Sequence, residues 1–130
     1  MDTAAGPSVL LVEDELLVLE LLREALEEAG YAVQATHSAA EALREIEANG
    51  SKLSALVTDI RLREATNGWD LAARVREVNA TVAVVYMTGD SAHEWNSRGV
   101  PLSTVIMKPM APSQVIVAIA SLLNRTDDSA

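Results

Sequence analysis

Chemically reactive side chains stand at the ends of four apolar runs in this sequence. Asp59 closely follows residues 55–57, Glu13 and Asp14 follow residues 9–12, Thr88 follows residues 82–87, and Lys108 follows residues 105–107. Short apolar runs of this kind predict strands of a parallel sheet that is covered on both faces. The carboxyl ends of such strands meet at one edge, where open α/β sheets place their ligand sites. We therefore predict a single site centred on Asp59.

Three neighbouring carboxylates restrict the chemistry of such a site. At about 4 Å and an effective dielectric constant near 20, each like-charge pair costs on the order of 4 kcal/mol before screening. A divalent cation relieves this repulsion, and Mg²⁺ prefers carboxylate oxygens, retained waters and phosphate. The residue types suit phosphoryl transfer to Asp59 as the nucleophile, with Lys108 and Thr88 contacting phosphate oxygens. Each residue alone could be an ordinary surface or turn residue, so the joint placement carries the prediction.

The remaining sequence alternates strand patterns with helix patterns. We predict strands at residues 9–12, 31–35, 55–57, 82–87 and 103–107. We predict helices at residues 15–29, from Ser38 to about residue 49, at 68–78 and at 112–125, with a short helical or irregular stretch at 92–98. Ser38 and Glu41 are predicted to form a capping box. Five βα units in succession predict an α/β fold, a doubly wound five-stranded parallel sheet with helices on both faces.

Composition narrows the protein class further. The 130 residues, 49% of them hydrophobic, predict one domain at residues 9–125, with flexible tails at 1–8 and 126–130. The absence of cysteine excludes a disulfide framework and thiol chemistry. A net charge of −9 disfavours nucleic-acid binding. The longest apolar run, at residues 115–123, is about half of the roughly 20 residues that span a bilayer, and the N-terminus lacks a signal peptide, so we predict a cytoplasmic protein without membrane association.

Five stretches of the sequence resemble the receiver domain of bacterial two-component response regulators. They are VLLVEDE, LVTDIRL, NGWDLAARVRE, YMTGD and VIMKP, and the resemblance covers about residues 8–125. It implies a flavodoxin-like receiver fold with strand order 2-1-3-4-5 and a cis peptide bond before Pro109.

The resemblance also assigns roles to individual residues. It implies that Asp59 is the phosphoacceptor, Thr88 the switch hydroxyl and Lys108 the phosphate-binding lysine. It implies a Mg²⁺ site formed by Glu13, Asp14, Asp59 and the backbone carbonyl of Arg61, with Asp14 as a direct ligand.

The function implied is that of a stand-alone phosphorelay receiver. A histidine kinase or a histidine phosphotransfer protein would phosphorylate Asp59, and the domain would catalyse only its own phosphorylation and dephosphorylation. Output would be protein–protein contact with a downstream target that the sequence does not identify, or onward phosphotransfer. The alternative is a receiver-like binding module that works without phosphorylation. A hydrolase of the haloacid-dehalogenase type is disfavoured, because its second acid would stand where Arg61 lies.

The first predicted helix has more apolar positions than one buried face can hold. Val18, Leu22, Ala25 and Ala29 form the predicted core stripe, which leaves Leu16, Leu17, Leu19 and Leu21 outside it. We predict that these four leucines dock the helices of the phosphodonor. The alternatives are burial in a homodimer and a scattered surface distribution.

The sequence departs from the usual receiver pattern beside the site. Arg63 and Glu64 replace a common Met-Pro pair, and Gly68 comes about one residue late, which predicts a longer, more polar and more mobile loop at residues 63–67. Val105 stands where receivers usually have an aromatic switch residue, so Tyr86 becomes the nearest aromatic able to respond to Thr88. His37 and His93 are predicted at the surface, and Trp69 and Trp95 are predicted to pack at its edge.

Overall fold

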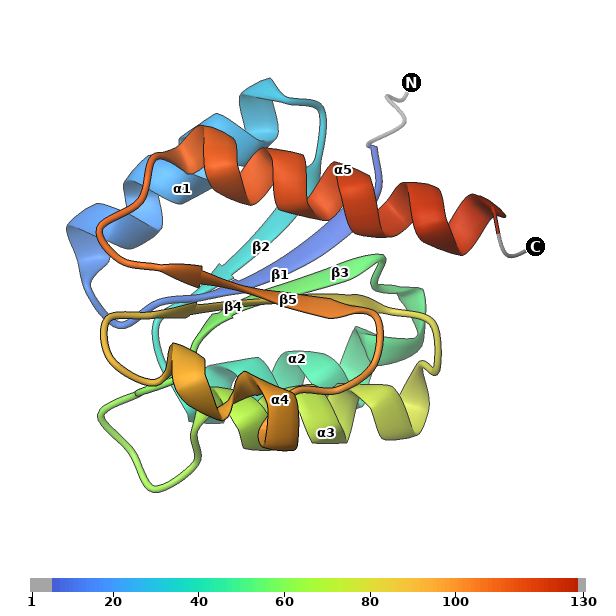
Figure 1. Cartoon of the computed structure of the whole chain (residues 1–130). Coiled ribbons are helices and arrows are strands. Elements are labelled where there is room, and N and C mark those ends of the chain that lie inside the picture. Colours follow the sequence, from blue (N-terminus) through green and yellow to red (C-terminus); the bar gives the residue numbers. More distant parts are fainter. Residues whose placement is uncertain (1–5, 129–130) are drawn as a thin grey trace.

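The computed structural model describes the backbone of residues 6–128 and the side chains of residues 6–125. The outer parts of both predicted tails, residues 1–5 and 129–130, lie outside the described residues. Five parallel strands form one sheet in the order β2-β1-β3-β4-β5, which confirms the predicted order (Figure 1). The strands are β1 (Ser8–Val12), β2 (Ala32–Thr36), β3 (Ala55–Asp59), β4 (Ala83–Thr88) and β5 (Ser103–Met107).

Helices cover both faces of the sheet, as predicted (Figure 1). On one face lie α1 (Leu16–Glu28) and α5 (Pro112–Asp128), and on the other lie α2 (Ala39–Asn49), α3 (Gly68–Val78) and α4 (Trp95–Arg98). Short 3₁₀ turns, η1 (Gly50–Lys52) and η2 (Ala92–Glu94), follow α2 and precede α4. Helix α5 extends three residues beyond its predicted end at residue 125. Among the helices that the structure describes, none combines the length and the apolar character needed to span a membrane.

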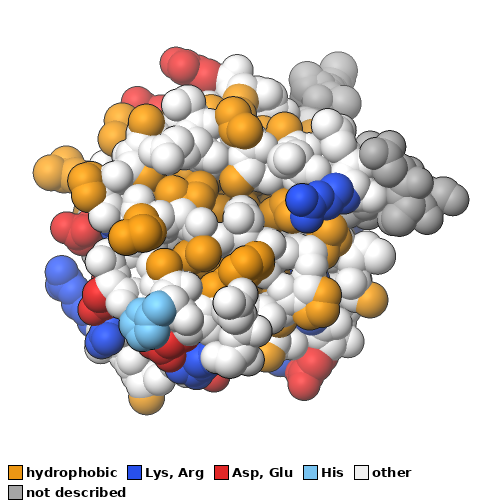
Figure 2. All heavy atoms as spheres, in the orientation of Figure 1, with side chains coloured by type: hydrophobic (Ala, Val, Ile, Leu, Met, Phe, Trp, Pro, Cys, Tyr) orange, Lys and Arg blue, Asp and Glu red, His pale blue; other side chains and the backbone are white. Residues whose placement is uncertain are grey.

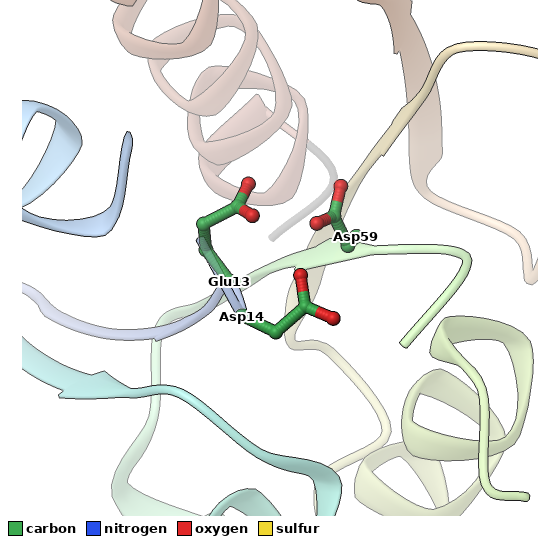
Figure 3. Close-up of side chains that lie close together, drawn as sticks. All are labelled: Glu13, Asp14 and Asp59. Carbon is green, nitrogen blue, oxygen red and sulfur yellow. The ribbon is translucent and has the colours of Figure 1, made fainter. Parts of the chain in front are cut away.

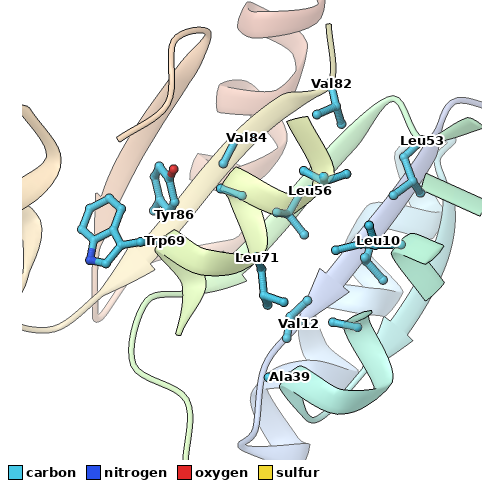
Figure 4. Close-up of a cluster of buried hydrophobic side chains, with 14 of the residues drawn as sticks. Leu10, Val12, Ala39, Leu53, Leu56, Trp69, Leu71, Val82, Val84 and Tyr86 are labelled. Atoms are coloured by element: carbon cyan, nitrogen blue, oxygen red, sulfur yellow. The ribbon is translucent and has the colours of Figure 1, made fainter. Parts of the chain in front are cut away.

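Side chains alternate between two hydrophobic layers along each central strand. Leu10, Leu56 and Val84 lie in the layer beneath α2 and α3, part of which is drawn in Figure 4. Their neighbours Leu11 and Val57 lie in the layer beneath α1 and α5. Every residue of β3 and β4 is buried. This burial fixes the strand register and therefore the positions of the strand ends.

Trp69 is buried in the core and not at the surface, so its predicted position is wrong. It is 4% exposed, and its ring centroid lies 4.6 Å from that of Tyr86 at an interplanar angle of 51° (Figure 4). Trp69 is the second residue of α3 and lies on the face of that helix that packs on the sheet. Trp95 is half-buried, and its Nε1 donates a hydrogen bond to Ser103 Oγ at 3.0 Å. His37 and His93 are exposed, as predicted.

The buried stripe of α1 is rotated from the predicted one. Leu19, Leu22 and Leu26 are buried, whereas Ala29 is exposed. The larger leucines occupy the core because they bury more apolar area than the alanines of the predicted stripe. Leu19 is therefore a core residue and cannot belong to a docking surface. Leu16, Leu17 and Leu21 are 64%, 88% and 55% exposed.

Two helix caps differ from the prediction in an informative way. Ser38 Oγ accepts a hydrogen bond from the Glu41 N–H at 3.1 Å, but the Glu41 carboxylate accepts from the His37 N–H, so the predicted capping box is only half formed. A complete box instead begins α3, where Asn67 and Asp70 each accept a hydrogen bond from the other's backbone N–H. This box fixes the end of the loop beside the site.

The outer edge of the sheet is incompletely covered. Helix α4 has only four residues, and Met107 at the end of β5 is 60% exposed. A hollow of about 500 Å³ lies here, lined by Trp95, Ser103, Val117 and Arg125 among others. Figure 2 shows hydrophobic side chains gathered over this face, between α5 and α4.

Candidate functional site

The loops after β1 and β3 bring the three predicted acids together. β3 pairs with β1 through Val12 and Thr58, so Glu13 and Asp14 emerge beside Asp59, the last residue of β3. One carboxylate oxygen from each of the three lies within 4.8 Å of the others (Figure 3). Glu13 is fully buried and Asp59 is 5% exposed, whereas Asp14 is half-buried. The sequence prediction of a clustered acidic site is thus met by the geometry.

Lys108 lies between two of these acids. Its Nζ is 2.8 Å from Asp59 Oδ1 and 2.9 Å from Glu13 Oε1. The lysine is placed by the end of β5, because its backbone N–H donates to the carbonyl of Thr88 at 2.7 Å. The following Lys108–Pro109 bond is cis, as the resemblance implied. The second oxygen of Glu13 accepts from the Glu15 N–H at 3.0 Å, which satisfies a buried carboxylate.

The electrostatics of the metal-free site favour a proton at Asp59. Burial, reinforced by a hydrogen bond with Glu13 and opposed by Lys108, raises the pKa of Asp59 to about 8. Burial also acts to lower the pKa of Lys108, but its hydrogen bonds with Asp59 and Glu13 outweigh that effect and raise it. The single positive charge of Lys108 therefore does not neutralise the carboxylates around it.

Two arginines of the β3–α3 loop complete the rim of the site. Arg63 Nε lies 3.5 Å from Asp14 Oδ2, and Arg61 Nε donates to Asp90 Oδ1 at 2.9 Å. Both arginines line a cavity of about 240 Å³ together with Asp14, Asp59 and Lys108. Sequence reasoning did not predict either ion pair. The signal was the replacement of an apolar residue by Arg63 so close to an acidic cluster.

Thr88 is buried at the end of β4, and its hydroxyl oxygen organises the following turn. The oxygen accepts hydrogen bonds from the backbone N–H groups of Asp90 and Ser91, at 3.1 and 2.8 Å. Asp90 Oδ1 in turn accepts from Ser91 Oγ and from Arg61. The hydrogen bond from Ser91, and to a smaller extent that from Arg61, holds the pKa of Asp90 below its usual range. Thr88 is thus connected through Asp90 to the β3–α3 loop.

The β3–α3 loop is tethered along its length, although the sequence predicted greater mobility. The Glu64 carboxylate accepts from the backbone N–H groups of Ala39 and Ala40, at 2.6 and 3.4 Å, at the first turn of α2. An acid there is favoured by the helix dipole. The Gly68 N–H donates to the Ile60 carbonyl at 2.8 Å. Sequence reasoning could not have found the Glu64 contact, because the partners lie about 25 positions apart.

The predicted switch residues lie side by side on neighbouring strands. Tyr86 of β4 pairs with Val105 of β5 in the sheet register. Tyr86 is fully buried, and its hydroxyl accepts a hydrogen bond from the Val100 N–H at 3.2 Å. Val105 is half-buried and packs against the same hydrophobic layer. The aromatic side chain of this region is therefore supplied by β4.

The donor set fits Mg²⁺. Three acids supply hard oxygen atoms within reach of one ion, and their negative charge exceeds that of Lys108. A hard divalent cation with oxygen ligands and retained waters suits such a half-open cluster. The position of the Arg61 backbone carbonyl as a further ligand remains a prediction.

Comparison with known proteins assigns the family. Residues 9–120 match the family model of the response regulator receiver domain. A solved response regulator receiver protein from Sinorhizobium medicae WSM419 is 36% identical, with a TM-score of 0.87 over 92% of this chain and 96% of that one. Alginate biosynthesis transcriptional regulatory protein AlgB of Pseudomonas putida is 33% identical over 88% of this chain, and transcriptional regulatory protein ResD of Bacillus subtilis is 27% identical over 99%. The match spans only 25% of AlgB and 53% of ResD. The chain belongs to the response regulator receiver domain family of two-component signalling proteins.

Proposed function

We propose that Asp59 accepts a phosphoryl group from a phosphohistidine of a histidine kinase or a histidine phosphotransfer protein. An Asp59 carboxylate oxygen attacks phosphorus, the P–N bond breaks, and the imidazole leaves with a proton from solvent. The observation that carries this proposal is the pairing of Asp59 Oδ1 with Lys108 Nζ at 2.8 Å, beside two further acids and an open cavity. A nucleophile, a phosphate-binding cation and oxygen ligands for a metal ion stand together.

Mg²⁺ bound by Glu13, Asp14 and Asp59 would neutralise the charge that develops on the phosphoryl oxygens. Lys108 would bind one of those oxygens as a mobile point charge. The Thr88 hydroxyl donates a long hydrogen bond to Asp90 Oδ1 at 3.5 Å, which it would exchange for one to another phosphoryl oxygen. Gly89 presents no side chain at the cavity, and a Cβ there would meet no atom within 4 Å. The same residues would serve hydrolysis of the phospho-aspartate, the only other reaction that we propose.

Exposed leucines on α1 support direct docking of the donor. Leu16 and Leu17 begin the helix that follows the acidic pair, and Leu21 lies one turn farther along it. All three are exposed, and Leu16 directly follows Glu15, which lines the cavity. We propose that helices of the donor pack on it.

The proposal is tested by incubation of the purified protein with acetyl phosphate and Mg²⁺, followed by intact-mass measurement. One phosphoryl group should be added to the wild type and none to Asp59→Asn. Asp90→Asn provides a control, because Asp90 lines the same cavity but is not the acceptor. Modification of Asp59→Asn, or loss in Asp90→Asn alone, would reject Asp59 as the acceptor. An unmodified wild type would instead favour a receiver-like binding module that works without phosphorylation.

A further inference from the structure

Arg63 provides the cation for the acid that Lys108 does not pair with. Lys108 Nζ forms its short contacts with Glu13 and Asp59, whereas the ion pair of Asp14 is made with Arg63, at 3.5 Å from Nε to Oδ2. The two cations thus divide the three acids between them. Arg63 is a departure of this sequence, and its contact bears on the residue expected to be a direct metal ligand.

We propose that Arg63 is an internal cation that competes with the divalent metal ion for the Asp14 carboxylate. The inference rests on the proposed metal site and adds a control on its affinity. The guanidinium and a metal ion both require the Asp14 oxygens, and they repel one another within the same cavity of about 240 Å³. Metal binding therefore displaces the Arg63 side chain, and the protein binds the ion more weakly than its three acids alone would.

The surroundings of Arg63 keep the free-energy cost of this exchange small. The Arg63 side chain is 78% exposed, so water can solvate its guanidinium after displacement. The Asp14 side chain is only 16% exposed, so its carboxylate is still stabilised by a nearby cation, which the metal ion then provides. The loop backbone does not have to move. Glu64 stays bound to the first turn of α2, and Gly68 stays bound to the Ile60 carbonyl. Only the flexible arginine side chain changes its position.

Arg61 offers a matched control within the same loop. It carries the same charge and lines the same cavity, but its guanidinium pairs with Asp90 at 2.9 Å instead of with the metal-binding acids. Its predicted contact with the metal is made by the backbone carbonyl, which Arg61→Gln keeps. Neutralising either arginine changes the net charge equally. Only Arg63 contacts Asp14, so direct competition and a general charge effect predict different results for the two variants.

The test is a titration of metal-stripped protein with Mn²⁺, an ion with a similar preference for oxygen ligands, with free Mn²⁺ measured by electron paramagnetic resonance. Arg63→Gln should bind Mn²⁺ about two- to five-fold more tightly than the wild type, the range expected for loss of a partly exposed ion pair. Arg63→Lys and Arg61→Gln should remain close to the wild-type affinity. Displacement of Mn²⁺ by added Mg²⁺ should rank the wild type and the three variants in the same order of affinity. Thermal unfolding of each variant verifies that it is folded.

The NMR signal of the Arg63 Nε–H group provides a second readout. It should shift when Mg²⁺ is added to the wild type and stay in place in Asp14→Asn. Unchanged or weaker Mn²⁺ binding by Arg63→Gln would overturn the inference, and so would equal tightening by Arg61→Gln. Failure of the wild type to bind Mn²⁺ at all would reject the proposed metal site itself, and the inference with it.

Discussion

The Tyr86 hydroxyl accepts a hydrogen bond from the backbone N–H of Val100 at 3.2 Å, and so links the interior of β4 to the segment between α4 and β5. Burial raises the pKa of Tyr86, which keeps the hydroxyl neutral as a hydrogen-bonding group. Its ring packs against Trp69, and its neighbour in the sheet is Val105. The Tyr86 side chain is therefore held in place by packing in the core and by one hydrogen bond.

We predict that Tyr86→Phe destabilises the protein by about 1 kcal/mol, because the half-buried Val100 N–H loses its acceptor while the ring packing is retained. The midpoint of thermal unfolding should fall by roughly 3–6 °C for a domain of this size. Tyr31→Phe, a half-buried tyrosine elsewhere, is the control. An equal change in the two variants would show that the Val100 contact contributes nothing measurable.

A second prediction concerns how phosphorylation is read out. Val105 has no ring and a stiff side-chain torsion, so it cannot follow Thr88 as an aromatic residue would. Thr88 is connected through Asp90 to Arg61 instead. Beryllofluoride, a phosphoryl mimic, should therefore shift amide NMR signals of Tyr86, Thr88 and residues 63–67 more than that of Val105. Val105→Tyr should retain phosphorylation and alter partner binding. Dominant shifts at Val105 with an unaffected loop would contradict this.

The fold and the clustering of the acids were predictable because both follow from local patterns. Apolar runs that end in Asp14, Asp59 and Lys108 define strand ends, and parallel strands bring those ends to one edge. The helical stripe of α1 was less predictable. The helix has seven leucines and valines, so its sequence is compatible with more than one buried face. Packing against the sheet determines that Leu19 lies on the buried face.

The contacts that organise the rim of the site were beyond sequence reasoning. Glu64 was interpreted as part of a mobile loop, yet it binds the first turn of α2, and Trp69 was placed at the surface although it packs on Tyr86. Each contact joins residues that are distant in the chain, and neither has a local periodicity. Such contacts depend on how the loop and helices settle on the sheet, which single-sequence patterns do not encode.

Two glycines beside the site should respond differently to a methyl group. A Cβ on Gly68 would lie 2.3 Å from the Asp59 carbonyl oxygen, whereas a Cβ on Gly89 would meet no atom within 4 Å. We predict that Gly68→Ala destabilises the protein by about 1–3 kcal/mol, as overpacking against backbone does, and that Gly89→Ala leaves stability nearly unchanged. Urea denaturation measures both. A tolerated Gly68→Ala would mean that the end of β3 yields without cost.

The raised pKa of Asp59 predicts a pH dependence of the metal-free stability. Because the pKa of about 8 for Asp59 in the folded state exceeds its ordinary value of 3.8, the folded state binds more protons between these pH values. The contribution of Asp59 to stability is therefore greatest below about pH 4, falls as the pH rises through this window, and levels off above about pH 8. The slope is at most about 1.4 kcal/mol per pH unit.

Asp59→Asn removes this proton linkage. Without metal, the variant should gain stability relative to the wild type as the pH rises from 6 to 8.5, measured by thermal unfolding at each pH. The two proteins differ only at position 59, so the difference between them isolates the contribution of Asp59. Mg²⁺ should flatten the wild-type dependence because it competes with the proton. A difference that stays constant over this range would mean that Asp59 is ionised throughout.

The exposed end of α1 should govern phosphotransfer from a protein donor. Leu17 is 88% exposed at the first turn of the helix that follows the acidic pair, so its side chain contributes little to the fold. An added charge there would be buried without a partner when the donor's helix packs on it. We predict that Leu17→Glu slows transfer from the cognate phosphohistidine donor by about ten-fold or more, which corresponds to roughly 1.4 kcal/mol of transition-state binding. Phosphorylation by acetyl phosphate should be unaffected.

Val117→Glu is the matched control, because Val117 is 67% exposed on α5. Equal loss with both donors would indicate damage to the site, and equal loss in both variants would exclude α1 as the docking surface.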